Sequence, residues 1–168
     1  MAWSLRHLGD IARDRGDASQ AESLYRQSLE AFHQHGDPWS AGGLQVDLGM
    51  LALATGDASK ATELFRQAME SCQQLGGQKR GLARALEGFA LAAARTGDVR
   101  RAITLAGAAG ALRNAIGARL TPAEQRAVTA GLERARAALT AAERTSVWNE
   151  GWSMPVEDAI EYAIATAG

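Results

Sequence analysis

A pattern with a period of about 40 residues runs through the first two thirds of this 168-residue sequence. Each copy has an apolar residue followed by glycine or alanine, and then a Gly-Asp pair. An alanine follows, and the last position of the pattern stands four residues after that alanine. The copies are Leu8-Gly9, Gly16-Asp17, Ala21 and Tyr25; Leu48-Gly49, Gly56-Asp57, Ala61 and Phe65; and, more weakly, Phe89-Ala90, Gly97-Asp98, Ala102 and Ala106. A fixed period of about 20–50 residues is typical of folds in which one small unit stacks on the next.

The Gly-Asp pairs are best explained as turns between helices. Apolar residues recur with helical spacing on both sides of each pair. Glycine can end a helix in the left-handed conformation, and Asp17, Asp57 and Asp98 can accept hydrogen bonds from the free amides of the next helix. We therefore assign these aspartates to helix capping and not to catalysis.

The whole chain is predicted to be helical. Its 36 alanines and only 3 prolines favour helices, and Thr121-Pro122-Ala123-Glu124 has the form of a capping box with proline in the first turn. Periodicity and turn signals predict helices over 2–15, 18–35, 39–55, 58–75, 79–96, 99–116, about 121–140, 142–151 and 156–166.

The predicted fold class is an all-α, right-handed solenoid of helical hairpins. We expect a single domain over residues 1–168. Its repeats are expected at about 1–37, 38–77 and 78–117, followed by capping helices over 118–168.

The copies resemble the tetratricopeptide repeat, whose signature is W-x2-L-G-x2-Y, then A-x3-F, then proline. The second copy reads Gln45-x2-Leu48-Gly49-x2-Ala52 and then Ala61-x3-Phe65. The period exceeds the usual one of about 34 residues, and the final proline is absent. Each helix is therefore expected to be longer than in the standard unit.

A narrower resemblance is to the C-terminal repeat region of large bacterial ATP-dependent transcriptional regulators of the LuxR and AfsR type. The residues that carry it are Leu105-Ala106-Gly107-Ala108-Ala109, Leu112-Arg113-x2-Ile116-Gly117, Thr121-Pro122-Ala123-Glu124, Trp148-Asn149-Glu150-Gly151 and Val156-Glu157-Asp158-Ala159-Ile160. The resemblance implies a detached sensor or scaffold region with a role in bacterial signalling or transcription regulation. The sequence has no G-x-x-x-x-G-K-[ST] loop, so no ATPase is carried over from that family, and no DNA-binding module is either.

In tetratricopeptide arrays the first helix of each hairpin lines a concave groove in which partners bind. The resemblance therefore implies a set of groove candidates: Trp3, Arg6, Asp10 and Arg13 in the first hairpin, Val46, Met50 and Leu53 in the second, and Arg84, Glu87, Leu91 and Arg95 in the third. The arginines would pair with carboxylates while an apolar side chain packs on Met50 and Leu53. The expected partner is a protein or peptide, bound as an extended segment or by its C-terminal carboxylate.

Two alternatives stay open for this surface. Val46, Met50 and Leu53 could instead be buried against the capping helices or a second subunit. The chain could also be a small-molecule sensor, with a ligand held between the groove and the capping helices. Helices of the 121–166 region that fold back over the groove would favour the sensor.

The first hairpin suggests a further partner. Trp3, Leu5 and Leu8 begin the array, and repeat arrays need their terminal surfaces covered. A symmetric homodimer through the first hairpin is one way to cover them.

No residue pattern indicates an enzyme, a cofactor or a metal site. His33 and His35 are two residues apart near the end of a predicted helix, so they point to different faces. Cys72 has no histidine near it in the sequence and is expected to be a small apolar helix residue.

Trp148 and Trp152 are four residues apart and so share one helix face. With Tyr162 they could form an aromatic pocket, or they could anchor the C-terminal helices on the array. Gly107 and Gly110 lie among alanines, which indicates close packing of helices and not a phosphate-binding loop.

Charge and hydropathy exclude several classes of protein. The net charge of −1 excludes a strongly basic nucleic-acid binder. Residues 79–144 carry 12 basic and 5 acidic groups but only one aromatic residue, Phe89, so we do not expect a nucleic-acid partner. No apolar run approaches the ~18 residues that span a bilayer. A single cysteine and the lack of an apolar signal sequence predict a cytoplasmic protein with no membrane partner.

Overall fold

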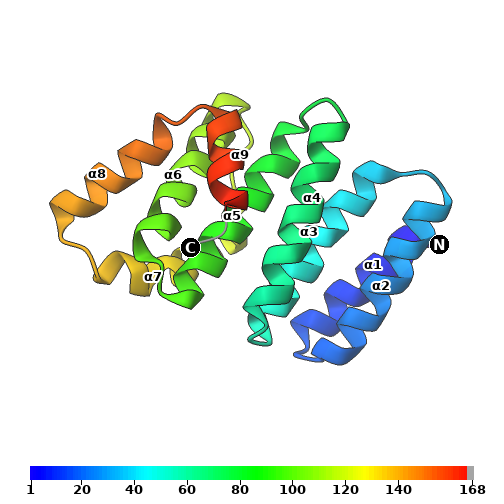
Figure 1. The fold of residues 1–168 in the computed structure, drawn as a ribbon. Coiled ribbons are helices and arrows are strands. Elements are labelled where there is room, and N and C mark those ends of the chain that lie inside the picture. The colour runs from blue at the N-terminus through cyan, green and yellow to red at the C-terminus, as the bar shows by residue number, and fades with distance from the viewer. Residues whose placement is uncertain (166–168) are drawn as a thin grey trace. The chain divides into compact units, whose positions relative to one another are not determined.

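The structure is a computed structural model that describes residues 1–165. Within these residues it has nine α-helices and no strand (Figure 1): α1 Ala2–Asp14, α2 Ala18–Gln34, α3 Pro38–Ala54, α4 Ala58–Gln74, α5 Lys79–Thr96, α6 Val99–Ala115, α7 Pro122–Ala137, α8 Ala141–Trp152 and α9 Val156–Ile164. The predicted all-α fold is confirmed, and each predicted helix is present. Residue 166, the predicted end of the last helix, lies outside the described residues.

The helices fall into two compact units, one over residues 1–77 and one from residue 78 onward. Consecutive helices pack against each other from α1 to α4 in the first unit and from α5 to α7 in the second, as expected for a helical solenoid of the tetratricopeptide kind. The first unit contains α1–α4 and the second contains α5–α9. A single domain over the whole chain stays a prediction.

In the first unit, the repeated glycine and the repeated aromatic residue are partners in packing. Helix α1 packs on α2, α3 on α4, and α2 on α3. Tyr25 of α2 and Phe65 of α4 are fully buried. A Cβ atom placed on Gly9 would lie 2.5 Å from ring carbons of Tyr25, and one on Gly49 would lie 2.8 Å from Cδ1 of Phe65. The two residues therefore recur together because each ring lies against the bare backbone of the preceding helix.

The turns between the helices of each hairpin have the predicted chemistry. Asp57 Oδ1 accepts a hydrogen bond from the backbone N–H of Lys60 at 2.9 Å. Asp17 and Asp98 cap α2 and α6 in the same way. Gly56 precedes Asp57 with a φ of 91°, in the region that favours glycine. The assignment of the three aspartates to capping is confirmed.

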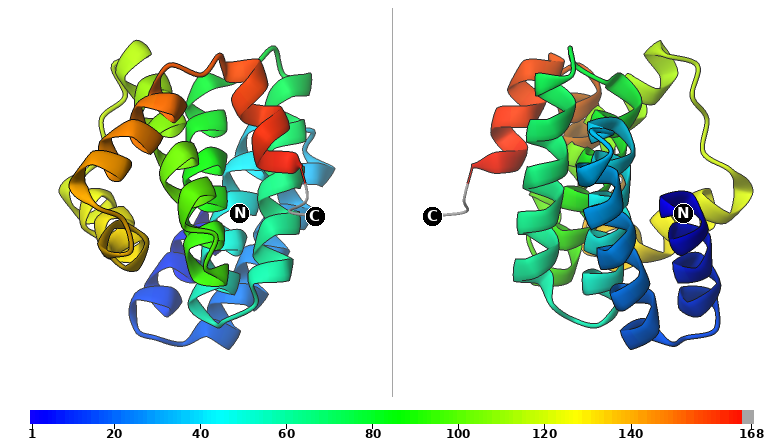
Figure 2. Two further views of the ribbon diagram at one scale, coloured as in Figure 1. Left: turned by 60° about the vertical axis from the view of Figure 1, so that its left-hand side comes forward. Right: turned by 90° about the vertical axis from the view of Figure 1, so that its right-hand side faces the viewer.

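In the second unit, α5 and α6 form a hairpin and the three later helices pack around it. Helix α8 packs along α6, α7 contacts both α5 and α6, and α9 contacts the same two helices (Figure 2). A Cβ atom on Gly107 would lie 3.1 Å from the backbone nitrogen of Trp152, and one on Gly151 would lie 3.0 Å from that of Ala108. The predicted close packing around Gly107 is confirmed, because α6 and α8 approach at backbone distance.

Capping boxes start both α7 and α8. In the first, the Thr121 hydroxyl accepts from the Glu124 N–H, and the Glu124 carboxylate accepts from the Thr121 N–H, as predicted. Burial alone would raise the pKa of Glu124, but the hydrogen bonds from Thr121 and the nearby positive charges of Arg113 and Arg84 lower it. The second box, Thr140 with Glu143, was not predicted.

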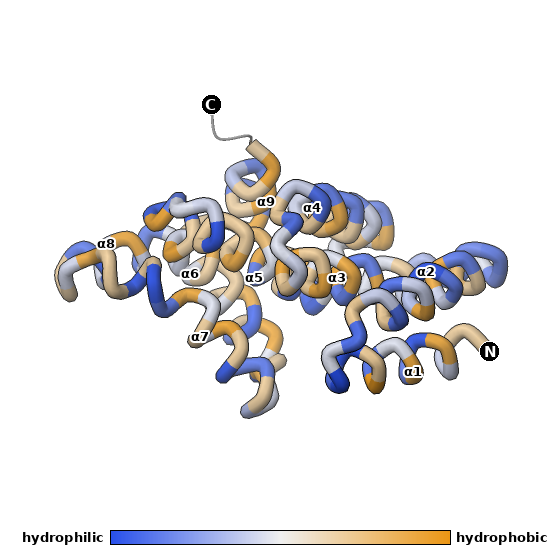
Figure 3. The backbone as a smooth tube through the Cα atoms, turned by 90° about the horizontal axis from the view of Figure 1, so that it is seen from below, coloured by the Kyte–Doolittle hydropathy of each residue, from blue (hydrophilic) through white to orange (hydrophobic). Residues whose placement is uncertain are grey.

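Hydropathy varies along the helices. In Figure 3, both α2 and α3 have hydrophilic and hydrophobic residues, and along α2 the two kinds alternate, as expected for a helix with one buried face. None of the helices in residues 1–165 is long and apolar enough to cross a membrane.

Candidate binding site

The groove candidates on α1 are largely engaged with carboxylates of the same unit. Arg6 Nη2 donates to Asp47 Oδ2 of α3 at 2.6 Å, and its guanidinium carbon lies 5.4 Å from the ring centroid of Trp3. Trp3 itself is 51% exposed. The Asp47 carboxylate neutralises the charge of Arg6. A partner at this end of α1 would therefore contact the apolar ring of Trp3 and would not meet an unpaired charge on Arg6.

Arg13 and Asp10 belong to a network around the repeat aromatic Tyr25. The Tyr25 hydroxyl donates to Asp10 Oδ1 at 2.7 Å and accepts from Arg13 Nη1 at 3.2 Å. Arg13 also donates to Asp14. Burial and the hydrogen bond to Asp10 raise the pKa of the Tyr25 hydroxyl far above its usual range. The two candidates therefore hold α1 on α2.

The apolar candidates on α3 are mostly inaccessible. Val46 and Leu53 are buried, and Met50 is half-buried. The alternative to an open groove, burial of this stripe against the capping helices or a second subunit, stays a prediction.

On α5, the candidate stripe is covered by a capping helix. Leu91 is buried, and a Cβ atom added to Gly131 of α7 would overlap its Cδ2. Glu87 is half-buried, and both of its carboxylate oxygens accept from Arg113 of α6. Arg84 is half-buried and Arg95 is exposed. Helix α7 thus folds back over this face of α5, the arrangement that favours a sensor.

Helices α5, α6, α7 and α8 surround a pocket of about 580 Å³, which we call the cap pocket. Such a volume is typical of small-molecule sites. The pocket is lined by Glu87, Ala90, Ala106, Gly110, Arg113, Asn114, Gly117, Arg119, Leu120, Gln125, Val128, Thr129, Leu132, Arg136, Trp148 and Trp152. Of the groove candidates, Glu87 alone contributes to this lining.

Two alanines that line the cap pocket stand at the repeat positions where the first two hairpins have a glycine and an aromatic residue. In repeat register, Ala90 corresponds to Gly49 and Ala106 to Phe65, and both alanines line the pocket. The third repeat therefore lacks the ring that fills this site between the helices of the first two hairpins. This substitution was visible in the sequence, where it marks the third copy as the weak one.

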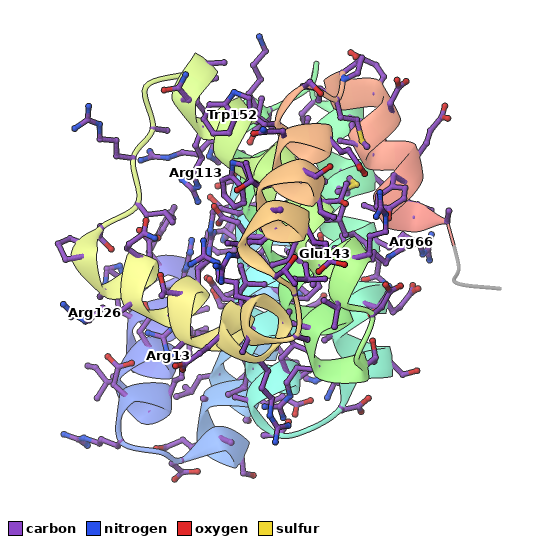
Figure 4. The ribbon with its side chains drawn as sticks, turned by 90° about the vertical axis from the view of Figure 1, so that its left-hand side faces the viewer. Arg13, Arg66, Arg113, Arg126, Glu143 and Trp152 are labelled. Carbon is purple, nitrogen blue, oxygen red and sulfur yellow. The ribbon has the colours of Figure 1, made fainter. Side chains whose placement is uncertain are left out.

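The three arginines that line the cap pocket differ in whether a carboxylate is paired with them. Arg113 is buried, bonds Glu87, and donates to the carbonyl oxygen of Ala118 at 3.1 Å. Burial would lower the pKa of Arg113, but its bonds to Glu87 raise it, so the guanidinium keeps its positive charge. Arg119 and Arg136 form no ion pair within residues 1–165. Figure 4 shows Arg113 beside the connection that leads from α6 to α7, with Trp152 at the end of α8.

The two tryptophans serve as anchor and as pocket wall. The rings of Trp148 and Trp152 stack with centroids 6.3 Å apart and an interplanar angle of 28°. A Cβ atom on Gly110 would lie 3.2 Å from each ring, so α6 leaves room for them. Tyr162 is not part of this lining; its ring lies under the guanidinium of Arg101.

Residues that could support metal chemistry do not cluster. Within residues 1–165 there is no group of three or more His, Cys, Asp and Glu side chains that could hold a metal ion. Cys72 is buried in α4, while His33 and His35 are exposed at the end of α2.

Comparison with known proteins gives one family match. Residues 40–114, which extend from α3 to the end of α6, match the family described as tetratricopeptide repeat. No curated protein and no solved structure matches the chain. Tetratricopeptide repeats are in general protein–protein interaction modules without a catalytic role. The matched segment covers the second and third copies of the sequence pattern.

Proposed function

We propose that this chain is a non-enzymatic protein-interaction module that binds another protein through the exposed face of α1. The observation that carries this proposal is the set of large apolar side chains on that helix. Trp3, Leu8 and Ile11 are 51%, 50% and 47% exposed. Around the helix axis Ile11 lies between the other two, about 60° from Leu8 and about 80° from Trp3, and all three are at least about 100° from the buried Gly9. Contiguous exposed apolar surface of this kind is typical of interaction sites.

A second copy of the chain is the proposed occupant of the α1 face. A symmetric dimer would place Leu8 and Ile11 of each copy against the other, which removes both from water. The carboxylates of the unit already neutralise Arg6 and Arg13, so apolar contact is the main source of stability for such an interface.

Solution molar mass, measured by light scattering after size exclusion, tests this dimer. We expect the native chain to have a molar mass near twice 17.7 kDa and the Leu8→Asp variant to have one near 17.7 kDa. Thr62→Asp on α4 is the matched control, since it adds the same charge at another exposed helix position of the unit. A native monomer, or a Leu8→Asp dimer, would contradict the proposal.

Binding of a partner peptide along the predicted groove remains a proposal in a modified form. Val46, Leu53 and Leu91 are buried. The accessible candidates are the exposed Trp3, Arg13 and Arg95 and the half-buried Arg6, Asp10, Met50, Arg84 and Glu87. A cytoplasmic location and a place in a bacterial signalling or transcription regulator are also proposals, supported by the resemblance to LuxR- and AfsR-type regulators. An ATPase module in the encoding reading frame would support that role.

The second candidate function is small-molecule sensing by the second unit. The observation that favours it is the cap pocket, which exists because α7 folds over α5 while α8 packs on α6. A ligand there would contact both a repeat hairpin and the capping helices. Ligand binding could thus change how the capping helices are held.

A further inference from the structure

The cap pocket has a net positive charge. Its lining holds three arginines and one glutamate, and therefore a charge of +2. Arg113 uses its guanidinium for Glu87 and for the carbonyl oxygen of Ala118. Arg119 is exposed, Arg136 is half-buried, and neither has an ion-pair partner among residues 1–165. Guanidinium groups bind carboxylate, phosphate and sulfonate-like oxygens through paired hydrogen bonds.

Another part of the lining is apolar. Trp148 and Trp152 present stacked indole rings, and Val128 and Leu132 of α7 add aliphatic surface. Ala90 and Ala106 also line the pocket, and their small side chains leave free the space that the aromatic ring fills in the first two repeats. An aromatic or other flat apolar group fits such a surface because stacking on indole adds to the burial of apolar area.

We propose that the cap pocket binds a small organic anion. Its acidic group pairs with Arg119 and Arg136, and its flat apolar body lies against Trp148 and Trp152. This inference rests on the second candidate function, small-molecule binding by the second unit, and adds the chemical class of the ligand. A neutral apolar molecule leaves both arginines without a counter-charge, so the pocket should discriminate against it.

A pair of fluorescent probes tests the requirement for charge. The anion is 8-anilino-1-naphthalenesulfonate, and its neutral counterpart is N-phenyl-1-naphthylamine, which has the same rings without the sulfonate. We expect saturable binding of the sulfonate to the full chain, with an affinity at least about tenfold higher than that of the neutral probe. Equal affinities would overturn the proposal.

Arginine variants locate the anion. Arg119→Ala and Arg136→Ala should each weaken sulfonate binding about tenfold and leave the neutral probe unaffected. Arg134→Ala is the matched control, because Arg134 is an exposed arginine of α7 that does not line the cap pocket. Sulfonate binding that Arg134→Ala weakens as much as Arg119→Ala and Arg136→Ala would overturn the proposal. Circular dichroism checks that all three variants keep the helical fold.

A pocket-filling variant separates the proposal from the function on which it rests. The double substitution Ala90→Gly and Ala106→Phe restores the glycine–aromatic pair of the first two repeats and should abolish binding of either probe. If this variant abolishes binding while the two arginine variants do not weaken it, the pocket binds ligands but not through charge, and only the anion proposal fails. If neither probe shows saturable binding to the native chain, both the anion proposal and the sensor function fail.

Discussion

At Gly49 of α3, the ring of Phe65 occupies the space that a side chain would need. The same relation holds between Gly9 and Tyr25, so this glycine position of the repeat is tightly packed in the structure. Gly42, on the same helix α3, is different, since its nearest neighbour would be Ser71 Cβ at an ordinary 3.6 Å. Gly42 and Gly49 therefore allow the effects of packing and of helix propensity on stability to be separated.

We predict opposite effects of alanine at these two positions. Gly49→Ala should lower the free energy of unfolding by about 1–3 kcal/mol because the methyl group forces the Phe65 ring to move. Gly42→Ala should raise it by up to about 1 kcal/mol because alanine loses less backbone freedom in a helix. Urea denaturation followed by circular dichroism measures both. A Gly49→Ala chain as stable as Gly42→Ala would show that the ring contact does not constrain the helices.

Because of Tyr25, the free energy of unfolding depends on pH in the alkaline range. Its pKa is raised in the folded chain by burial and by the hydrogen bond to Asp10, while in the unfolded chain it is near 10. The stabilisation is therefore complete below about pH 10 and is lost as the pH rises from there toward the folded pKa. The loss is at most about 1.4 kcal/mol per pH unit.

Comparison with Tyr25→Phe isolates this effect. At pH 8 the variant should be less stable by about 1 kcal/mol, because the hydrogen bonds to Asp10 and Arg13 are lost. Between pH 10 and pH 12 we expect the difference to shrink, because only the native chain has this group to ionise. Urea midpoints of both proteins across this range provide the measurement, and a constant difference would contradict the raised pKa.

At the scale of helices, the turn between α3 and α4 depends on one carboxylate. Asp57→Ala should lower the free energy of unfolding by about 1 kcal/mol, since the N–H of Lys60 loses its acceptor. Asp57→Ser keeps an acceptor oxygen and should retain most of the stability. Urea denaturation of the two variants side by side tests the capping role, and equal losses would argue against it.

Helix boundaries were predictable because their signals are local. The Gly-Asp turns and the Thr121–Glu124 box each lie within a few residues and act through their own backbone. The ion pair of Arg6 with Asp47 was not predictable in this way, because it joins residues 41 positions apart whose approach depends on how α1 faces α3. The sequence shows that Arg6 is available for a carboxylate but not that one is already in place.

The direction taken by α7 could not be predicted for a related reason. The capping box fixes where α7 begins, whereas its course over α5 depends on packing of Gly131 against Leu91. The cap pocket follows from that course, so the sequence offered a site between the groove and the capping helices only as an alternative and did not give its lining. Its floor did leave a sequence signal: Ala106 stands where the first two copies have an aromatic residue.

At the scale of the whole molecule, the two compact units have separate sets of tryptophans. Trp3 and Trp39 lie in the first unit, and Trp148 and Trp152 lie in the second. A chain that keeps only one pair, with the other pair changed to phenylalanine, therefore reports on one unit. Because most contacts of each unit are internal, each is expected to unfold as its own cooperative segment.

Gly151→Ala tests this independence. The added methyl group would meet the backbone of Thr104 and Ala108, so it should push α8 away from α6 and destabilise the second unit. In urea, the signal from Trp148 and Trp152 should then change at a clearly lower concentration than in the chain without the substitution. The signal from Trp3 and Trp39 should hardly shift. Equal shifts of both signals would instead indicate one cooperative domain over the whole chain, as the sequence led us to expect.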